Sequence, residues 1–124
     1  MSGVWSEQWG RESVSKLFAD RKTAPDAVFC GNDQIARGVI DALRERSIYV
    51  PADVSVVGFD NWEVMAEAAR PPLTTIDMNL EEMGRETGRL LMELIGGKHL
   101  HGTRRLPCSL VIRDSCGAKR KTTN

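Results

Sequence analysis

The sequence predicts an α/β fold, with a mostly parallel sheet flanked by helices. Segments of helical and strand-like hydrophobic period alternate along the chain, in the order helix–strand repeated four times. The apolar run at residues 54–59 is nearly continuous, as in strands that are covered on both faces of a parallel sheet. Hydrophobic residues make up 41% of the 124 residues. That is enough to form the core of one domain, or of a piece of a larger one.

The first predicted helix runs from an N-cap at Ser6 to about Asp20. Its apolar side chains recur at helical spacing: Trp9, Val14, Leu17 and Phe18. A polar connector containing Pro25 follows, because the residue before a proline is pushed out of the helical region.

The stretch from Val28 to Gly38 is predicted to be a strand that runs directly into a helix. Either Asn32 or Asp33 suits the N-cap, since both side chains can accept from the first turn. The following apolar residues lie on one helical face: Ile35, Ala36, Val39, Ile40 and Leu43. In open α/β sheets, the carboxyl end of a strand that meets a helix start is where small ligands bind.

A second strand, Val54–Phe59, ends in the polar pair Asp60-Asn61. A short helix is then predicted from Trp62 to Ala69. Because the carboxyl ends of parallel strands share one edge of a sheet, we expect this pair and the Asn32-Asp33 pair to lie close together.

The remaining elements follow Pro71-Pro72. Leu73–Ile76 is predicted to be a third short strand, and Leu106–Asp114 the last. Between them, Asn79 and Glu82 resemble a capping box that opens a helix over residues 79–95, which Gly96 ends. Its predicted buried stripe comprises Leu80, Met83, Thr87, Leu91 and Leu94, and its predicted ion pairs are Glu81–Arg85 and Arg89–Glu93. Residues 118–124 are predicted to be a disordered tail.

Composition excludes several classes of function. Seventeen basic and seventeen acidic residues cancel, whereas a free-standing nucleic-acid binder has a basic excess. The three cysteines form no CxxC pair and are expected to be reduced thiols. No secretion signal and no apolar run of membrane-spanning length is present. We therefore expect a soluble, cytoplasmic protein with no membrane partner.

The motifs of common enzymes are also absent. The sequence contains neither GxGxxG nor GxxxxGK[ST] after a strand, and no nucleophile elbow. His99 and His101 lie in a Gly-rich connector without further metal ligands at suitable spacing. The sequence thus predicts no enzyme, no metal site and no cofactor.

The residues that remain at the strand ends are polar and unreactive. Amides and carboxylates can bridge neighbouring hydroxyls, and an aromatic face can cover the apolar side of a sugar ring. Asn32 and Asp60 suit ligand contact and helix capping equally well, whereas Asp33 and Asn61 are expected to be caps. Two aromatic residues near helix starts are, taken singly, more often core anchors than sugar platforms: Trp5 and Trp62.

Three blocks in this order are more specific than any single motif: Pro25–Gly38, Val50–Asp60 and Pro72–Ile76. Together they strongly resemble the LacI/GalR family of bacterial transcription repressors, over about Gly3 to Ser115. The resemblance implies a two-lobed effector-binding core like that of periplasmic sugar-binding proteins, preceded by a helix-turn-helix and a hinge helix. It also implies a homodimer that binds operator DNA and responds to a small effector, usually a sugar.

The same resemblance suggests roles for individual residues. Trp5 is similar to the family's effector-stacking position, and Asn32 and Asp60 to its polar effector contacts, which leaves Asp33 and Asn61 as helix caps. Met78 and Trp62 are weaker candidates at the same cleft, and Asn79 is expected to cap the helix over residues 79–95. Ser47 lies where relatives commonly place a helix-ending Gly, so a strained turn is expected there.

The helix-turn-helix, the hinge and the first lobe have no counterpart in these 124 residues. By resemblance, residues 3–117 are the C-terminal portion of the effector-binding domain, and the helix over residues 79–95 would belong to the first lobe. Operator DNA would then be bound only through the N-terminal domain. The exposed apolar stripe of this helix leads us to expect self-association of the chain. The alternative function is a stand-alone cytosolic sugar-binding module without a regulatory role.

Overall fold

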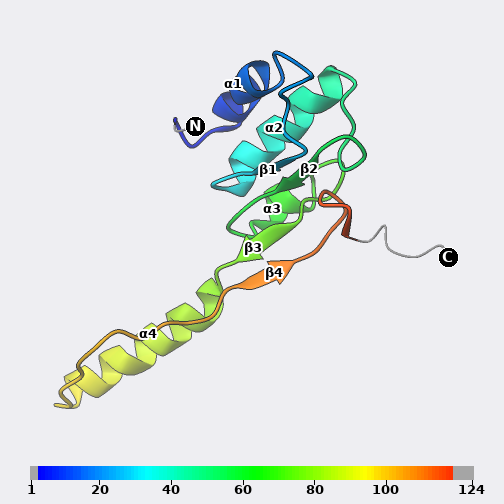
Figure 1. The fold of residues 1–124 in the computed structure, drawn as a ribbon. Helices are drawn as coiled ribbons and strands as arrows, with labels where there is room; N and C mark the ends of the chain where they lie inside the picture. Colours follow the sequence, from blue (N-terminus) through cyan, green and yellow to red (C-terminus); the bar gives the residue numbers. More distant parts are fainter. Residues whose placement is uncertain (1–2, 119–124) are drawn as a thin grey trace.

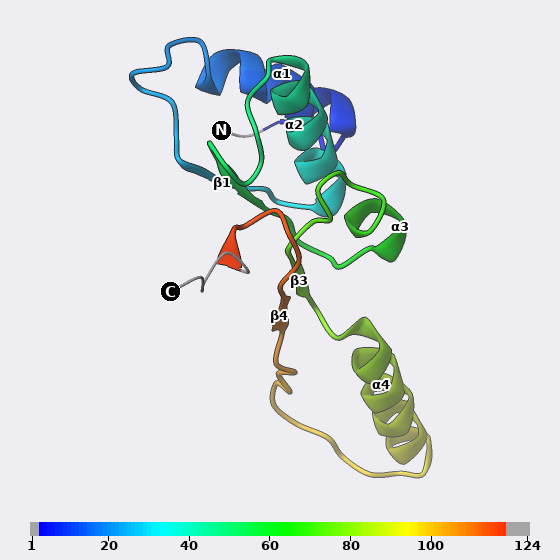
Figure 2. The ribbon, with the colours of Figure 1, turned by 90° about the vertical axis from the view of Figure 1, so that its right-hand side faces the viewer.

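The computed structural model describes residues 3–118, and residues 119–124, most of the predicted tail, lie outside the described part. A body formed by α1–α3 and the strands continues into an arm formed by α4 and the segment that returns from it (Figures 1 and 2). Helix and strand alternate as predicted: α1 (Glu7–Leu17), β1 (Ala27–Phe29), α2 (Asp33–Glu45), β2 (Ser55–Val57), α3 (Glu63–Ala66), β3 (Thr75–Asp77), α4 (Leu80–Ile95) and β4 (Ser109–Val111).

The strands form two short pairs. β1 and β2 are parallel, with Val28 opposite Val56, and β3 and β4 are antiparallel. An isolated parallel bridge between Val57 and Thr74 joins the two pairs. The predicted α/β class is therefore confirmed. The last strand runs antiparallel because the chain reverses direction at the far end of the arm (Figure 1).

The core lies between α2 and the strands. Its buried apolar residues come mainly from the helical face predicted for α2 and from the ends of the strands: Ile35, Ala36, Val39, Ile40, Leu43, Cys30, Val54, Val56 and Leu73. α1 packs along α2 (Figure 2). A Cβ at Gly38 would collide with the main chain of Glu7, and one at Gly10 with the carbonyl oxygen of Ile35. Glycine at both positions therefore allows the close approach of the two helices.

The helix ends confirm some of the predicted boundaries. Ser6 is the N-cap of α1 and accepts from the N–H of Trp9, but α1 ends at Leu17 rather than near Asp20. Ser47, just beyond α2, has a φ of 55°. The N–H groups of Ser47 and Ile48 donate to the carbonyls of Arg44 and Leu43. This is the hydrogen-bond pattern of a Schellman motif, whose left-handed residue is usually Gly, so the predicted strained turn is confirmed.

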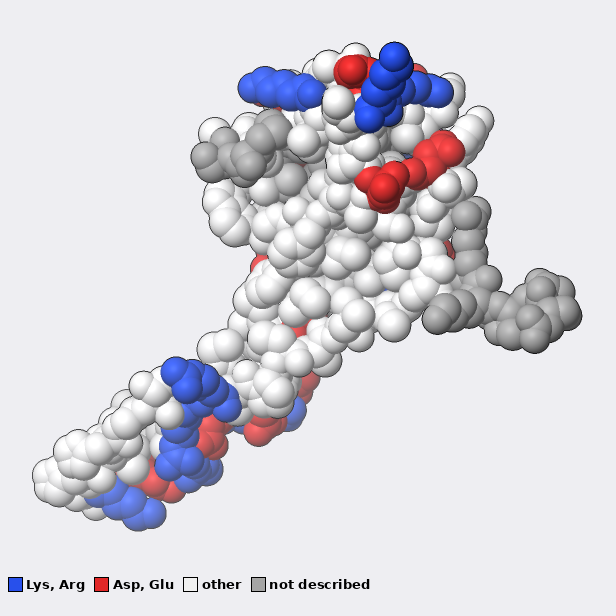
Figure 3. Space-filling model, viewed as in Figure 1, with Lys and Arg blue, Asp and Glu red and all other residues white. Residues whose placement is uncertain are grey.

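The arm differs most from the sequence prediction. None of the residues of α4 is buried within the described chain, so the predicted buried stripe is wrong for the chain alone. Large apolar side chains are exposed along it: Leu80, Leu91, Met92, Leu94 and Ile95. The predicted Glu81–Arg85 and Arg89–Glu93 ion pairs are both present. Figure 3 shows these opposite charges interspersed along the arm.

The predicted capping box of α4 is also wrong. Asn79 occupies the N-cap position but has a φ of 57° and makes no side-chain cap hydrogen bond. The carboxylate of Glu82 pairs with Arg85 instead. The Asn79 N–H donates to the Asp77 carboxylate at 2.7 Å. A left-handed backbone at Asn79 directs its side chain away from the first turn, because an N-cap side chain needs an extended backbone to reach that turn.

Candidate functional site

The loops that follow β1, β2 and β3 meet at one edge of the sheet. The N–H of Asp33 donates to the carbonyl of Phe59 at 2.8 Å, and the N–H of Asp60 donates to the carbonyl of Ile76 at 3.0 Å. The predicted proximity of the two polar pairs is therefore confirmed. These two main-chain bonds fix the positions of the strand ends relative to one another.

The structure places Asn32, rather than Asp33 as predicted, at the N-cap of α2. Asn32 is the N-cap of α2, because its backbone is extended and its Oδ1 accepts from the N–H of Ile35 at 2.8 Å. Its Nδ2 makes no hydrogen bond within the described residues, so the amide can cap the helix through oxygen and contact a ligand through nitrogen.

Asp33 is the first residue of α2 rather than its cap, and it is buried. Its Oδ1 accepts from the Thr75 hydroxyl at 2.5 Å and its Oδ2 from the Trp62 N–H at 2.8 Å. Burial raises the pKa of Asp33, against the opposing effect of these two hydrogen bonds. The carboxylate thus joins β3 to the loop after β2.

Residues 60–62, here called the Asp60 turn, have an unusual backbone. Asp60 and Asn61 have φ values of 107° and 51°, in a region that is costly for residues other than Gly. The prediction that Asn61 caps a helix is wrong, since Trp62 is the N-cap of α3 and no side-chain bond caps that helix.

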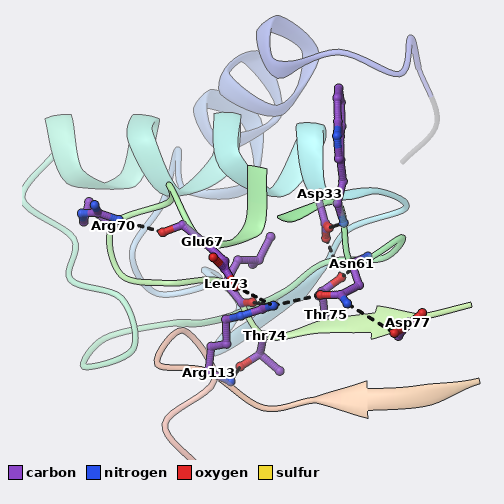
Figure 4. A network of polar contacts seen from close by, with 10 residues as sticks. Asp33, Asn61, Glu67, Arg70, Leu73, Thr74, Thr75, Asp77 and Arg113 are labelled. Carbon is purple, nitrogen blue, oxygen red and sulfur yellow. Dashed lines mark hydrogen bonds and ion pairs between the residues drawn. The ribbon is translucent and has the colours of Figure 1, made fainter. Parts of the chain in front are cut away.

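The amide of Asn61 instead joins two other elements (Figure 4). Its Nδ2 donates to the Asp77 carboxylate at 3.3 Å, and its Oδ1 accepts from Arg113 at 2.9 Å. Its main-chain N–H donates to the Thr75 hydroxyl at 3.3 Å. Asn61 therefore holds the turn in place from the side of β3.

A hollow of about 770 Å³ opens beside this turn. Its lining includes three of the predicted ligand-contacting residues, Asp60, Trp62 and Met78, together with Asp77 and several others: Asn61, Glu63, Val64, Leu80 and Glu81. No Lys or Arg lines it within residues 3–118. Burial, and then repulsion from the Asp33 carboxylate, raise the pKa of Asp60. The hollow therefore presents hydrogen-bond acceptors and an aromatic face to a ligand.

Trp5 and Asn32 lie outside this hollow. The Trp5 ring lies over Gly31, 3.5 Å from the point where a Cβ would stand, and its side chain is 64% exposed. Asn32 follows directly, and the Asp33–Phe59 bond connects this loop to the Asp60 turn. The predicted site residues thus come from the segment before α1 and from the loops that follow β1, β2 and β3, rather than from one pocket.

A second hollow, of about 520 Å³, lies between α4 and the segment that returns from it. Its lining combines apolar side chains, among them Phe59, Met83 and Leu90, with polar or charged ones: Glu86, Thr87, His101 and Arg104. Only Met78 lines both hollows. Because Met78 is the only predicted ligand-contacting residue that lines this second hollow within residues 3–118, we place the candidate site at the strand ends.

Sequence reasoning missed Asp77 and Arg113. Asp77 ends β3 as Asp60 follows β2, so the strand-end rule that singled out Asp60 also points to it. No local signal could have indicated Arg113, because it meets Asn61 only after the chain has returned from the arm.

The described residues contain no group of three or more His, Cys, Asp or Glu side chains suited to a metal ion. None of the described helices has the length and hydrophobicity that crossing a bilayer requires. The three cysteines are free, and burial raises the pKa of Cys30 to about 12.

Comparison with known proteins gives consistent matches. Residues 3–116 match the family described as the periplasmic binding protein-like domain. The HTH-type transcriptional repressor MelR of Bacillus subtilis is 37% identical over 119 residues, which cover 96% of this chain and 34% of MelR. The chain spans about a third of the length of the curated relatives it matches.

Solved structures agree with these sequence matches. A lac repressor dimer bound to operator and the anti-inducer ONPF is similar with a TM-score of 0.82 and 34% identity, over 92% of this chain and 39% of that one. The transcriptional regulator CelR in complex with cellobiose is similar with a TM-score of 0.78 and 34% identity, over 91% of this chain and 34% of that one.

Proposed function

The chain belongs to the periplasmic binding protein-like domain family, in the form found in the C-terminal part of the effector-binding domain of LacI-type regulators, and we propose that its strand-end edge is one half of an effector site. The effector is a sugar or a similar polyhydroxyl metabolite, bound between this edge and a second lobe. Effector binding changes the relation of the two lobes and, through a DNA-binding domain, the affinity for operator DNA.

The observation that supports this proposal most is the placement of Asp60. Its carboxylate lines a hollow of about 770 Å³ beside Trp62, and that hollow has no basic lining residue within the described chain. A carboxylate accepts from two hydroxyls at once, and an aromatic face packs on the apolar side of a sugar ring. An anionic ligand such as a sugar phosphate would be repelled from this side of the site.

The relatives support the choice of effector class and of regulation. CelR is described in complex with the disaccharide cellobiose, and the lac repressor as a dimer on operator DNA. We propose the same for the protein to which this chain belongs: a sugar-class effector, a homodimer and DNA binding outside the present residues.

The test is isothermal titration calorimetry on a two-lobed protein that includes this chain. The ligand panel consists of glucose, galactose, ribose, lactose, cellobiose and adenosine. For the compound that binds most tightly, Asp60→Ala and Trp5→Ala are each expected to weaken binding by about tenfold or more, since each removes a charge-assisted hydrogen bond or a stacking face.

Two matched controls exclude general effects of substitution. Asp26→Asn removes an exposed carboxylate at the opposite end of β1, and Tyr49→Ala removes an aromatic ring that is 66% exposed, close to the 64% of Trp5. Neither is expected to change affinity. If Asp60→Ala and Trp5→Ala also bind like the unmodified protein, the effector does not contact this edge and the proposal is wrong.

A further inference from the structure

We propose that Arg113 is a positioning residue for effector binding, which holds the Asp60 turn in place through the side chain of Asn61. This inference rests on the function proposed above for the strand-end edge. Arg113 follows β4, on the segment that returns from the arm, and lies 52 residues beyond Asn61 in the chain. Its side chain joins that returning segment to the Asp60 turn (Figure 4).

The guanidinium of Arg113 makes two well-defined hydrogen bonds. Nη2 donates to Oδ1 of Asn61 and Nη1 to the carbonyl of Leu73, both at 2.9 Å. Its main-chain N–H donates to the Thr74 hydroxyl, also at 2.9 Å. The side chain is only 15% exposed. Because a guanidinium is planar with donors in a fixed fork, these bonds define the position of Asn61 relative to the start of β3.

The Asp60 turn needs such support. Asp60 and Asn61 both have positive φ, a conformation that persists in L-residues where surrounding contacts determine it. The turn's other supports are the main-chain bond from Asp60 to Ile76 at 3.0 Å, the Trp62–Asp33 bond at 2.8 Å, and the longer Asn61 contacts to Thr75 and Asp77, each at 3.3 Å. Among the described residues, Arg113 makes the only charge-assisted hydrogen bond to Asn61 that is shorter than 3 Å. Charge-assisted hydrogen bonds are stronger than hydrogen bonds between neutral groups.

The position of the Asp60 carboxylate depends on this turn. No hydrogen bond holds that carboxylate within residues 3–118, whereas its main-chain N–H is fixed to Ile76. The backbone conformation of the turn therefore sets where the carboxylate lies. A loosened turn would let the carboxylate sample positions that do not match the ligand, and affinity would fall.

The first experiment needs no ligand and uses amide hydrogen exchange on the 124-residue chain. Arg113→Lys keeps the charge but cannot form both bonds of the fork. We expect exchange at the Asn61 and Trp62 amides to accelerate by at least about tenfold, while the amide of Val39 in α2 keeps its rate. If the two turn amides keep their rates, the inference is overturned.

Arg46→Lys is the matched control. Arg46 also forms two guanidinium bonds, to the carbonyl of Val14 at 3.0 Å and the hydroxyl of Ser15 at 2.7 Å, but between α1 and α2. This variant should leave the Asn61 and Trp62 amides unchanged. A similar acceleration in Arg46→Lys would show a general loss of stability and would overturn the specific role of Arg113.

A second variant decides the question if Arg113→Lys fails to fold. Asn61→Gly removes the acceptor of Arg113 but suits a φ of 51°, because Gly adopts positive φ without strain. The Trp62 amide should again exchange at least about tenfold faster. An unchanged Trp62 rate in this variant would overturn the inference.

The link to the effector is tested by a double-mutant cycle, using calorimetry on the two-lobed protein with the panel compound that binds most tightly. Arg113→Lys should weaken binding about tenfold in the unmodified background, but less than about twofold beside Asp60→Ala. Equal effects in both backgrounds would overturn the inference, because Arg113 would not act through the turn. If Asp60→Ala alone leaves affinity unchanged, the proposed function fails, while the exchange rates still decide whether Arg113 holds the turn.

Discussion

At the scale of single residues, the candidate site contains an acid whose position is unfavourable for the fold. Burial raises the pKa of Asp60, and the Asp33 carboxylate raises it further. Its backbone has a φ of 107°. Residues that oppose the stability of the fold in this way are typical of functional sites. We therefore expect Asp60 to lower the free energy of unfolding and to contribute to ligand affinity.

The cost can be measured by urea unfolding of Asp60→Asn at a fixed protein concentration. At pH 7 the folded chain contains an ionised Asp60 that it disfavours, so the neutral variant should have the higher unfolding midpoint. The folded pKa lies above the unfolded value of about 3.9. As the pH falls through the folded pKa, Asp60 becomes protonated, so the difference in unfolding midpoint between Asp60→Asn and the unmodified chain should decrease. A midpoint equal to or below that of the unmodified chain at pH 7 would contradict the account, with Asp26→Asn as the control.

A second residue-scale prediction concerns Ser47, whose φ is 55°. Ser47→Gly removes left-handed backbone strain, which raises the free energy of unfolding by about 1–2 kcal/mol. Gly also gives the unfolded chain more conformational freedom, which lowers the free energy of unfolding by about 0.4–1 kcal/mol. We expect a net gain of about 0.5–1 kcal/mol in the free energy of unfolding. Ser15→Gly, within α1, should instead lower stability, because Gly is the poorer helix former and because the hydroxyl that accepts from Arg46 is lost. Loss of stability in Ser47→Gly would show that the turn is not strained.

The neighbouring residues Asn32 and Asp33 show the limit of prediction at this scale. Both have side chains that can cap a helix, and the choice depends on which backbone is extended. Chemistry alone does not reveal that, and the resemblance assigned the cap to Asp33, whereas Asn32 is the N-cap. The hydrogen bond from Arg113 to Asn61 could not be predicted either, because it forms only where the segment that returns from the arm meets the body.

At the scale of elements, the order of helices and strands was predictable, because hydrophobic period is a local property of the chain. The meeting of the strand ends followed from the same pattern, since parallel strands share their carboxyl edge. The close packing of α1 on α2 was not predicted. It depends on Gly10, which lies against the main chain of Ile35, and on Gly38, which lies against that of Glu7, and these contacts require the tertiary fold.

This packing gives a prediction with a clear sign. A Cβ at Gly38 would collide with the main chain of Glu7, and backbone is costly to displace. Gly38→Ala should therefore lower the free energy of unfolding by about 1–3 kcal/mol, despite a gain of about 1 kcal/mol in helix propensity. Gly84→Ala is the matched control in α4, because nothing lies within 4 Å of its added Cβ. Urea unfolding should show a loss for the first variant and none for the second.

At the scale of the whole molecule, the arm determines how the chain behaves alone. α4 has no buried residue in the described chain, and Leu80, Leu91, Leu94 and Ile95 are exposed on it. The resemblance predicts that this helix lies on the first lobe of a two-lobed protein. The apolar side chains of α4 have the spacing of a helix that faces a core, which is why burial was predicted. The chain by itself leaves this face exposed.

We therefore predict that the 124-residue chain self-associates, with a second copy covering α4. Light scattering coupled to size-exclusion chromatography should give a mass above 13.8 kDa, rising with concentration. Leu91→Glu and Leu94→Glu, each in the exposed face, should lower that mass toward one chain. A mass of one chain across a wide range of concentrations would contradict the prediction.

The central claim is that the strand-end edge forms half of the effector site, and one measurement tests it most directly. This is a crystal structure of the two-lobed protein with the panel compound that binds most tightly. We predict a ligand hydroxyl within hydrogen-bond distance of the Asp60 carboxylate, a second polar contact to Nδ2 of Asn32, and an aromatic face of Trp5 or Trp62 against the ligand. A ligand bound instead in the hollow between α4 and the segment that returns from it, with no contact to Asp60, would contradict the account.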